Sequence, residues 1–394
     1  MESFPSSFFD IVHDRHIAGD IKYRTVPGVD DVIPMWIADM DFKSPPAVEE
    51  ALIAAVKHGI FGYAETDAEY DELVTAWYQK RMSWTIVPES ILKAPGVMFA
   101  IAAAIRALSR PNDSVLICQP VYYPFAKIIP ANDRKLVVTE LVLRAGRYEI
   151  DFTDLEDKIR TNAVKIILLC SPHNPVGRVW TREELLEIGR ICSQYNVYII
   201  SDEIHSDFIF TDHPHLPLAS LSEELAQRTI TCIAPTKTFN LAGLQASNII
   251  IPNEKIRRRV YQECRATGYS NLNTLAIAAT KAAYQNGELW LESLLSYLSG
   301  NYDALKEAFP EHGMISMIPP EGTYLAWLDC RRLGLTDSEL ETFFLRQARV
   351  RLHGGATFGA GGSGFVRMNI ACPRSVLLEG IARIRRALDT QGYK

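Results

Sequence analysis

The sequence of 394 residues contains no long hydrophobic run. A membrane-spanning helix needs about 18 to 20 consecutive apolar residues, and the best stretch, residues 97–108, is interrupted by Arg106. The N-terminus lacks a basic segment followed by an apolar one, so we expect no signal peptide. These absences predict a soluble, cytoplasmic protein that does not contact a membrane.

Cysteine is present but without pattern. The seven cysteines are scattered, with no C-x-x-C pair and no spacing typical of a metal site. Cys170, for example, ends an apolar run, where a thiol behaves as a small hydrophobic side chain. We therefore expect reduced cysteines in a reducing cytosol, with neither a disulfide framework nor a bound metal.

An excess of positive charge is also missing. The net charge is −6, which gives no indication of binding to nucleic acid or to an anionic membrane. The 47% of apolar and 22% of charged residues are typical of a globular protein, and the length suits two or three domains.

Short apolar runs alternate with helical patterns between residues 113 and 251. Thr181, followed by acidic residues and an apolar stripe, predicts the start of one such helix. The pattern predicts an α/β domain with a mainly parallel sheet. Its expected strands are residues 114–118, 135–141, 164–170, 197–201, 229–234 and 247–251.

The C-terminal part predicts a smaller α+β domain. A long helix over 289–309 leads to strands at 323–329 and 365–370 and to a final helix over 375–388. We expect an N-terminal arm at 1–45 that packs on the small domain or on a partner subunit. The large domain is then 46–285 and the small domain 286–394.

Three polar residues follow predicted strands, at the sheet edge where α/β proteins bind ligands. Lys237 follows the strand 229–234, where loss of solvent can lower the pKa of the amine and make it nucleophilic. Hydroxyls of Thr236 and Thr238 beside it suit a phosphate. Asp202 ends the strand before it, and Asn174 lies in a Pro-rich turn after 164–170. Each residue alone also fits an ordinary surface, capping or turn role.

Three weaker signals accompany them. Tyr122 lies in a loop where its ring could stack on an aromatic cofactor, although most such tyrosines only pack. Val97 and Met98 begin an apolar helix, and free N–H groups at a helix start can bind phosphate. Arg367 lies within an apolar strand, which is costly unless the guanidinium meets an anion. A substrate carboxylate and a structural ion pair both satisfy that requirement.

Taken in order along the chain, these features resemble the fold-type I pyridoxal-phosphate (PLP) enzymes of the aminotransferase class I/II superfamily. The resemblance covers nearly the whole chain. It implies the following roles: Lys237 carries PLP as a Schiff base, Asp202 pairs with the pyridine nitrogen, Asn174 donates to the phenolic oxygen, Tyr122 stacks on the ring, Val97, Met98 and Thr236 hold the phosphate, and Arg367 binds the substrate carboxylate.

Tyr63 matches a tyrosine that reaches the neighbouring subunit's phosphate in this superfamily. The resemblance therefore implies a homodimer with shared active sites.

Three segments are similar to the MalY/PatB type of cystathionine β-lyase (C–S lyase). They are residues 36–42 (WIADMDF), 201–207 (SDEIHSD) and 236–244 (TKTFNLAGL). This branch implies that Ala38 joins Arg367 and Asn174 in binding the amino-acid substrate. It also places His205 at the cofactor, where it either donates to the phenolic oxygen, meets the substrate or only packs.

The chain departs from many aminotransferases at the phosphate. Gln245 stands where many have arginine, and Ala234 stands where many have serine. Phosphate binding must then depend on helix N–H groups, Thr236 and Tyr63.

The resemblance predicts α,β-elimination of L-cystathionine or related cysteine S-conjugates to a thiol, pyruvate and ammonia. A PLP-dependent aminotransferase, which would require a 2-oxo acid, uses the same residues and is the alternative. A regulatory protein on the same fold is a third possibility, but Lys237 and Asp202 are both retained. The glycine-rich segment 354–364 lacks the context of a nucleotide-binding motif, and we interpret it as a flexible loop before the strand of Arg367.

Overall fold

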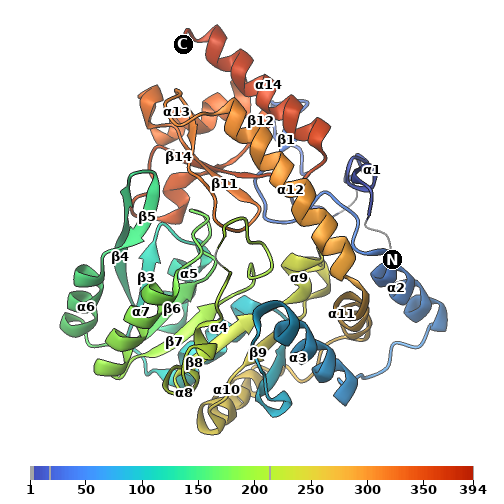
Figure 1. Cartoon of the computed structure of the whole chain (residues 1–394), viewed down its shortest axis with the longest axis vertical. Helices are drawn as coiled ribbons and strands as arrows, with labels where there is room; N and C mark the ends of the chain where they lie inside the picture. Colours follow the sequence, from blue (N-terminus) through green and yellow to red (C-terminus); the bar gives the residue numbers. More distant parts are fainter. Residues whose placement is uncertain (1–3, 17–18, 213, 394) are drawn as a thin grey trace.

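The computed structural model describes residues 4–16, 19–212 and 214–393. Its main sheet has eight strands in the order β2-β9-β8-β7-β6-β3-β4-β5, and the strands from β8 to β4 are parallel (Figure 1). The edge strands are β2 and β5, and antiparallel pairing joins β2 to β9, β9 to β8 and β5 to β4. The bounds are β2 (Ile91–Ala94), β3 (Ser114–Gln119), β4 (Lys135–Arg144), β5 (Arg147–Ile150), β6 (Val164–Cys170), β7 (Tyr198–Asp202), β8 (Thr229–Ile233) and β9 (Ser247–Ile250).

Both faces of this sheet are buried, which explains its consecutive apolar residues. In β6, Ile166 and Leu168 pack on one face beneath α4 (Val97–Leu108) and α10 (Glu254–Ala266). Ile167 and Leu169 pack on the other face, with α6 (Phe152–Thr161) and α7 (Arg182–Gln194). Side chains that alternate along a strand thus build two separate cores.

A second sheet has four antiparallel strands in the order β10-β11-β14-β13. It lies in the upper part of Figure 1, where α12 (Glu288–Ala308) runs from the main sheet toward it and α14 (Arg374–Thr390) covers it. Its strands are β10 (Ser316–Met317), β11 (Leu325–Asp329), β13 (His353–Gly354) and β14 (Phe365–Asn369). A parallel pair, β1 (Ile33–Pro34) with β12 (Val350–Arg351), joins the N-terminal segment to this region. The domain boundaries at 45 and 285 stay a prediction.

The remaining helices include α3 and α11, which contribute buried side chains to the core, and several shorter helices. They are α1 (Ser6–Phe9), α2 (Pro46–His58), α3 (Ala68–Met82), α5 (Pro124–Ile128), α8 (Glu223–Ala226), α9 (Pro235–Thr238), α11 (Thr274–Asn286) and α13 (Asp337–Thr342). Among the helices that the structure describes, none is both long and apolar enough to cross a membrane.

The α/β class and the mainly parallel sheet are confirmed. The predicted strand 164–170 coincides with β6, and the other five predicted strands agree with β3, β4, β7, β8 and β9 within a few residues. The edge strands β2 and β5 were not predicted. At the start of α7, Thr181 and Glu184 form the reciprocal hydrogen bonds of a capping box. All seven cysteines are buried free thiols.

The glycine-rich segment that we interpreted as a flexible loop contains a short 3-10 helix at Gly355–Phe358 and packs against the end of β3. The Ala360 N–H donates to Gln119 Oε1 at 2.9 Å, and the Phe358 carbonyl accepts from Val121 N–H at 3.0 Å. A Cβ added at Gly359 would lie only 2.2 Å from the Gln119 side chain. The glycines therefore allow this segment to pack closely against the loop that follows β3.

Candidate active site

The carboxyl ends of β6, β7 and β8 bring three of the predicted residues to one edge of the main sheet. Asp202 is the last residue of β7, and it lies opposite Cys170 of β6 and Cys232 of β8. Asn174 follows β6 directly, and Lys237 follows β8 in the short helix α9. Parallel strands end at the same side of a sheet, so residues far apart in sequence meet there.

Lys237 is partly buried, and its amine donates to the Ala38 carbonyl. Burial lowers the pKa of this amine to about 8, assisted by the charge of Arg367 and opposed by the charges of Asp39 and Asp202. A substantial fraction of the amine is therefore neutral near physiological pH, as a nucleophile or a general base requires.

Asp202 is buried at the floor of the site. Burial raises the pKa of its carboxyl to about 7, although a hydrogen bond from Ile204 N–H and the charge of Lys237 act in the opposite direction. Within the described ranges, that N–H at 3.3 Å is its one hydrogen-bond donor. A buried carboxylate with so few partners is suited to a cationic group on a ligand.

Arg367, on β14, meets Asn174 from the opposite sheet. Its Nη1 donates to Asn174 Oδ1 at 2.9 Å and its Nη2 to the Trp36 carbonyl at 2.8 Å. Burial lowers the pKa of the guanidinium to about 10, and its Nε has no hydrogen-bond partner within the described part of the chain. A buried cation held by neutral groups alone favours an anionic ligand, so the structural ion-pair interpretation is not supported.

Three predicted phosphate-binding groups lack protein partners. The helix α4 starts without a side-chain cap, and within the described residues the N–H groups of Val97 and Met98 have no acceptor. The Thr236 hydroxyl is likewise without a hydrogen bond there. Thr238, which we expected beside a phosphate, is buried and donates instead to Asp207 Oδ2 at 2.7 Å.

Tyr122 and His205 add aromatic rings. Tyr122 is partly buried, and its ring centroid lies 5.7 Å from that of Phe125. His205 is buried, and its Nδ1 has no hydrogen-bond partner among the described residues. Burial, with the charges of Lys237 and Arg367, lowers the pKa of His205 to about 3, so its imidazole is neutral.

Tyr324, on the segment before β11, is a site residue that the sequence did not indicate. Its hydroxyl donates to the Ala38 carbonyl at 3.1 Å, the same oxygen that accepts from Lys237. Its ring lies edge-on to His205, with 5.6 Å between centroids. No local pattern could reveal the contact, because 286 residues separate Tyr324 from Ala38.

Two of the segments used for the family resemblance contact one another. Asn240 Nδ2 donates to the carbonyls of Met40 and Phe42, and its Oδ1 accepts from Met40 N–H at 3.0 Å. These three hydrogen bonds fix the segment 36–42 against the helix that carries Lys237. The Ala38 carbonyl is thereby held in front of the amine.

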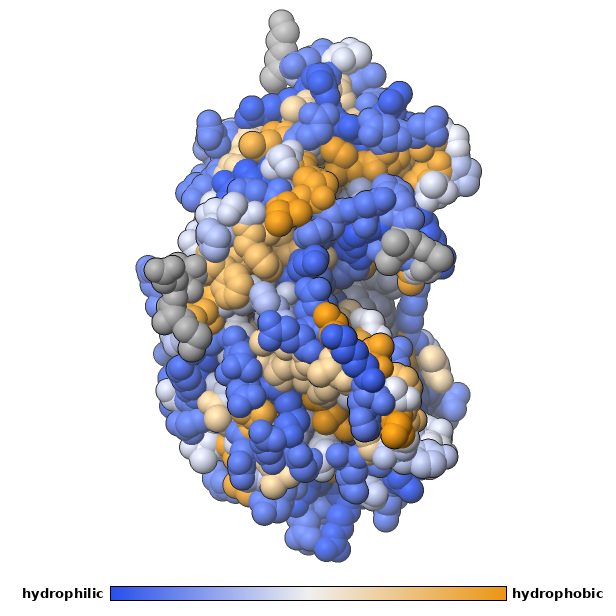
Figure 2. Space-filling model, turned by 90° about the vertical axis from the view of Figure 1, so that its right-hand side faces the viewer, coloured by the Kyte–Doolittle hydropathy of each residue, from blue (hydrophilic) through white to orange (hydrophobic). Residues whose placement is uncertain are grey.

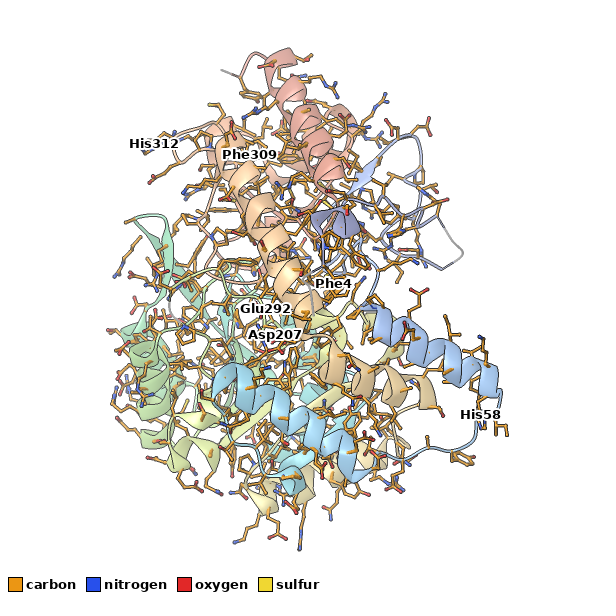
Figure 3. All side chains as sticks on the ribbon, turned by 45° about the vertical axis from the view of Figure 1, so that its right-hand side comes forward. Phe4, His58, Asp207, Glu292, Phe309 and His312 are labelled. Atoms are coloured by element: carbon orange, nitrogen blue, oxygen red, sulfur yellow. The ribbon has the colours of Figure 1, made fainter. Side chains whose placement is uncertain are left out.

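Asp207 stabilises α9, the helix that carries Lys237, through its contact with Thr238. Its Oδ1 accepts from Trp77 Nε1 at 3.2 Å and from Arg81 Nε at 2.9 Å, while its Oδ2 binds Thr238. Arg81 also pairs with Glu292 of α12 at 2.6 Å, and Figure 3 shows Asp207 and Glu292 near the lower end of that helix. Sequence reasoning missed this network, although Asp207 lies in the quoted segment 201–207.

Tyr63 lies away from the other residues, on the loop between α2 and α3. Its side chain is 110% exposed, and Ile60 and Phe61 beside it are 68% and 60% exposed. Figure 2 views the side of the molecule that carries α2 and shows apolar patches between polar areas there. Within one chain Tyr63 therefore does not contribute to the site.

These residues fit PLP. Two helix N–H groups and the Thr236 hydroxyl supply unpartnered donors for a phosphate. Asp202 supplies a buried carboxylate for the ring nitrogen, and Lys237 supplies an amine with a lowered pKa for the aldehyde.

Comparison with known proteins agrees with this chemistry. Residues 30–384 match the family model "Aminotransferase class I and II". The chain is 43% identical to the cystathionine β-lyase PatB of Bacillus subtilis, over 92% of this chain and 94% of that protein. It is 34% identical to the protein MalY of Escherichia coli, over 96% and 98%. The crystal structure of cystalysin from Treponema denticola, which contains PLP, is 38% identical with a TM-score of 0.94, over 97% and 99%.

Proposed function

Because the chain belongs to the aminotransferase class I and II family, we propose that it is a PLP-dependent C–S β-lyase. It cleaves the Cβ–S bond of L-cystathionine or a related cysteine S-conjugate and yields a thiol, pyruvate and ammonia. The observation that carries the proposal is a lysine whose pKa is lowered by burial and by the charge of a buried arginine that has no anionic partner among the described residues, in a chain whose relatives include a cystathionine β-lyase.

Arg367 and Asn174 bind and orient the substrate in this proposal. The guanidinium fork takes the α-carboxylate through two parallel hydrogen bonds. Asn174 Oδ1 fixes the rotation of the fork, and its amide nitrogen is left to donate to the phenolic oxygen of PLP. Ala38, whose carbonyl faces Lys237, borders the bound amino acid.

Asp202 and the phosphate-binding groups hold the cofactor. When bound, PLP supplies a protonated ring that accepts the electron pair left at Cα. Asp202 keeps the proton on the ring nitrogen, and Tyr122 packs on the ring. Val97, Met98 and Thr236 bind the phosphate, and His205, held neutral, borders the ring.

Lys237 moves the proton. With PLP and the substrate amino acid bound, the free amine of Lys237, whose pKa burial lowers to about 8, would remove the Cα proton. The electron pair would leave Cα as the Cβ–S bond breaks, and the departing thiolate would take up the proton from Lys237 to give the free thiol. Water converts the remaining three-carbon fragment to pyruvate and ammonia.

A homodimer completes the site in this proposal. Tyr63 is fully exposed beside two exposed apolar residues, and the family resemblance directs it to the phosphate of a neighbouring subunit. It would supply a donor that compensates for Gln245 and Ala234, which replace the usual arginine and serine of the phosphate site. The seven free thiols support a reducing compartment, the cytoplasm.

The test uses the purified holoenzyme with L-cystathionine and no 2-oxo acid. We expect pyruvate and free thiol in equal amounts, and none from Lys237→Ala. A protein that forms neither product, but consumes amino acids when a 2-oxo acid is added, would be an aminotransferase instead.

A further inference from the structure

Arg351, at the end of β12, is a cation near the site that the mechanism does not use. Its guanidinium carbon lies 3.8 Å from the centroid of the Trp36 indole. Within residues 4–16, 19–212 and 214–393, it forms no ion pair and no hydrogen bond through its side chain. Stacking on the indole fixes the guanidinium and leaves its donor edges free for an anion.

Trp36 connects this cation with the substrate-binding arginine. Its carbonyl accepts from Arg367 Nη2, while its ring carries Arg351. His353 pairs with Arg367 across β13 and β14, and its ring lies 6.1 Å from the Trp36 ring. Burial and then the charges of Arg367 and Arg351 lower the pKa of His353 to about 3, so both cations lie close enough to affect the same neutral imidazole.

A cavity of about 570 Å³ opens beside these residues. Trp36, Arg351 and His353 line it, together with the exposed side chain of Glu341. A second acidic residue of the lining, Asp337, already accepts from Ser363 Oγ and Gly364 N–H, so Arg351 and Glu341 are the charged groups left for a ligand. Trp36, which also contacts Arg367, connects the cavity with the substrate site.

We propose that Arg351 binds a second carboxylate, carried on the thiol half of the substrate. The preferred substrates are then cysteine S-conjugates whose leaving thiol is itself an amino acid, because Glu341 suits the ammonium group next to that carboxylate. Conjugates with a small uncharged thiol have only the α-carboxylate, so they bind Arg367 and make no contact with Arg351. This inference rests on the proposed β-lyase function and specifies the substrate class for it.

The first test compares L-cystathionine with S-methyl-L-cysteine, which lacks the distal charges. We expect Arg351→Gln to lower kcat/KM for cystathionine by about 10- to 100-fold, the size of one charge-assisted contact, and to change kcat/KM for S-methylcysteine by less than about twofold. Arg351→Lys, which keeps the positive charge, should retain part of the preference for cystathionine over S-methylcysteine. The control Arg346→Gln removes an equal charge from an exposed position nearby in the sequence, and it should leave kcat/KM for both substrates unchanged.

If Arg351 had only a structural role, Arg351→Gln would lower kcat/KM equally for both substrates, and that result would overturn the proposal. Binding gives a second readout that does not depend on turnover. Calorimetry with L,L-2,7-diaminosuberate, in which carbon replaces the sulfur, should show weaker binding to Arg351→Gln, whereas 2-aminooctanoate should bind both proteins alike. If diaminosuberate binds the wild type and Arg351→Gln with equal affinity, the Arg351 subsite is refuted. If the wild type releases no pyruvate from either sulfur substrate, the lyase function alone is contradicted.

Discussion

Arg367 Nη1 and Asn174 Oδ1 form a hydrogen bond of 2.9 Å that joins the small sheet to the turn after β6. This contact fixes the arginine that we propose to bind the substrate carboxylate relative to the end of the main sheet. Preorganisation of this kind lets binding energy be spent on the reaction rather than on ordering the site.

Replacing Arg367 should mainly affect substrate binding. Arg367→Lys keeps the charge but loses the planar fork, so we expect kcat/KM to fall about 10- to 100-fold, mostly through a higher KM. Steady-state kinetics with cystathionine measure this, and Arg182→Gln, an exposed arginine, is the control. An unchanged KM would remove Arg367 from the carboxylate site.

Asp202 should make the apoprotein less stable as pH rises. Its pKa is raised from 3.8 to about 7 in the folded state, so folding takes up a proton between these values and stability falls through that window. Asp202→Asn avoids the buried charge. At pH 8 we expect the variant apoprotein to be more stable than wild type by up to about 4 kcal/mol, and below pH 4 to be equal. Urea unfolding at both pH values measures this; a difference independent of pH would contradict it.

Asp202→Asn should also lower turnover. We expect kcat to fall by about 10² to 10³-fold, because the ring nitrogen loses its charged partner. Stability and activity therefore change in opposite directions at pH 8, which separates the functional role of Asp202 from a structural one.

The pKa of Lys237 should set the pH dependence of cofactor loading. Only the neutral amine attacks the aldehyde, so the rate of PLP incorporation into apoprotein should rise with pH and level off above about 8. Absorbance of the lysine-bound cofactor follows the reaction, and Lys237→Ala should give no such band. A rate that keeps rising to pH 10 would mean that the amine has the pKa of an ordinary surface lysine.

Asp207 should be important for stability. Asp207→Asn removes a buried charge from Arg81 and weakens the contact with Thr238, so we expect a loss of about 3 kcal/mol in the free energy of unfolding. Asp303→Asn, at an exposed position of α12, is the matched control. If both variants unfold at the same denaturant concentration as wild type, the network does not support α9.

Tyr63 should affect cofactor binding only in the dimer. Sedimentation should give twice the mass of one chain, and Tyr63→Phe should leave that mass unchanged while weakening PLP binding by about tenfold, the size of one lost hydrogen bond to a charged group. A monomer that binds PLP at full affinity would refute the shared site.

Patterns of neighbouring residues predicted the strands and helix starts, whose formation depends on residues close together in sequence. Runs such as 164–170 revealed strands buried on both faces, and Thr181 revealed a helix start, because both depend on neighbouring residues. Lys237, Asp202 and Asn174 were accessible to prediction because each follows such a strand. Their roles came from the family resemblance and not from spacing.

Contacts between distant segments could not be predicted. Tyr324 reaches Ala38, and Arg351 stacks on Trp36, only because the small sheet folds back onto the N-terminal segment. No sequence pattern indicated a partner for the glycine-rich segment, so its close packing on Gln119 was not predicted. Thr238 was assigned to a phosphate because nothing in the sequence places Asp207 behind it.

The burial of all seven cysteines has a chemical consequence for an enzyme that releases thiols. Burial raises the pKa of the cysteine thiols, for example those of Cys118 and Cys192 to about 12, so little thiolate exists on the protein at neutral pH. Exchange with oxidised product requires an accessible thiolate to attack the disulfide. The folded protein should therefore resist the formation of mixed disulfides with its own oxidised product.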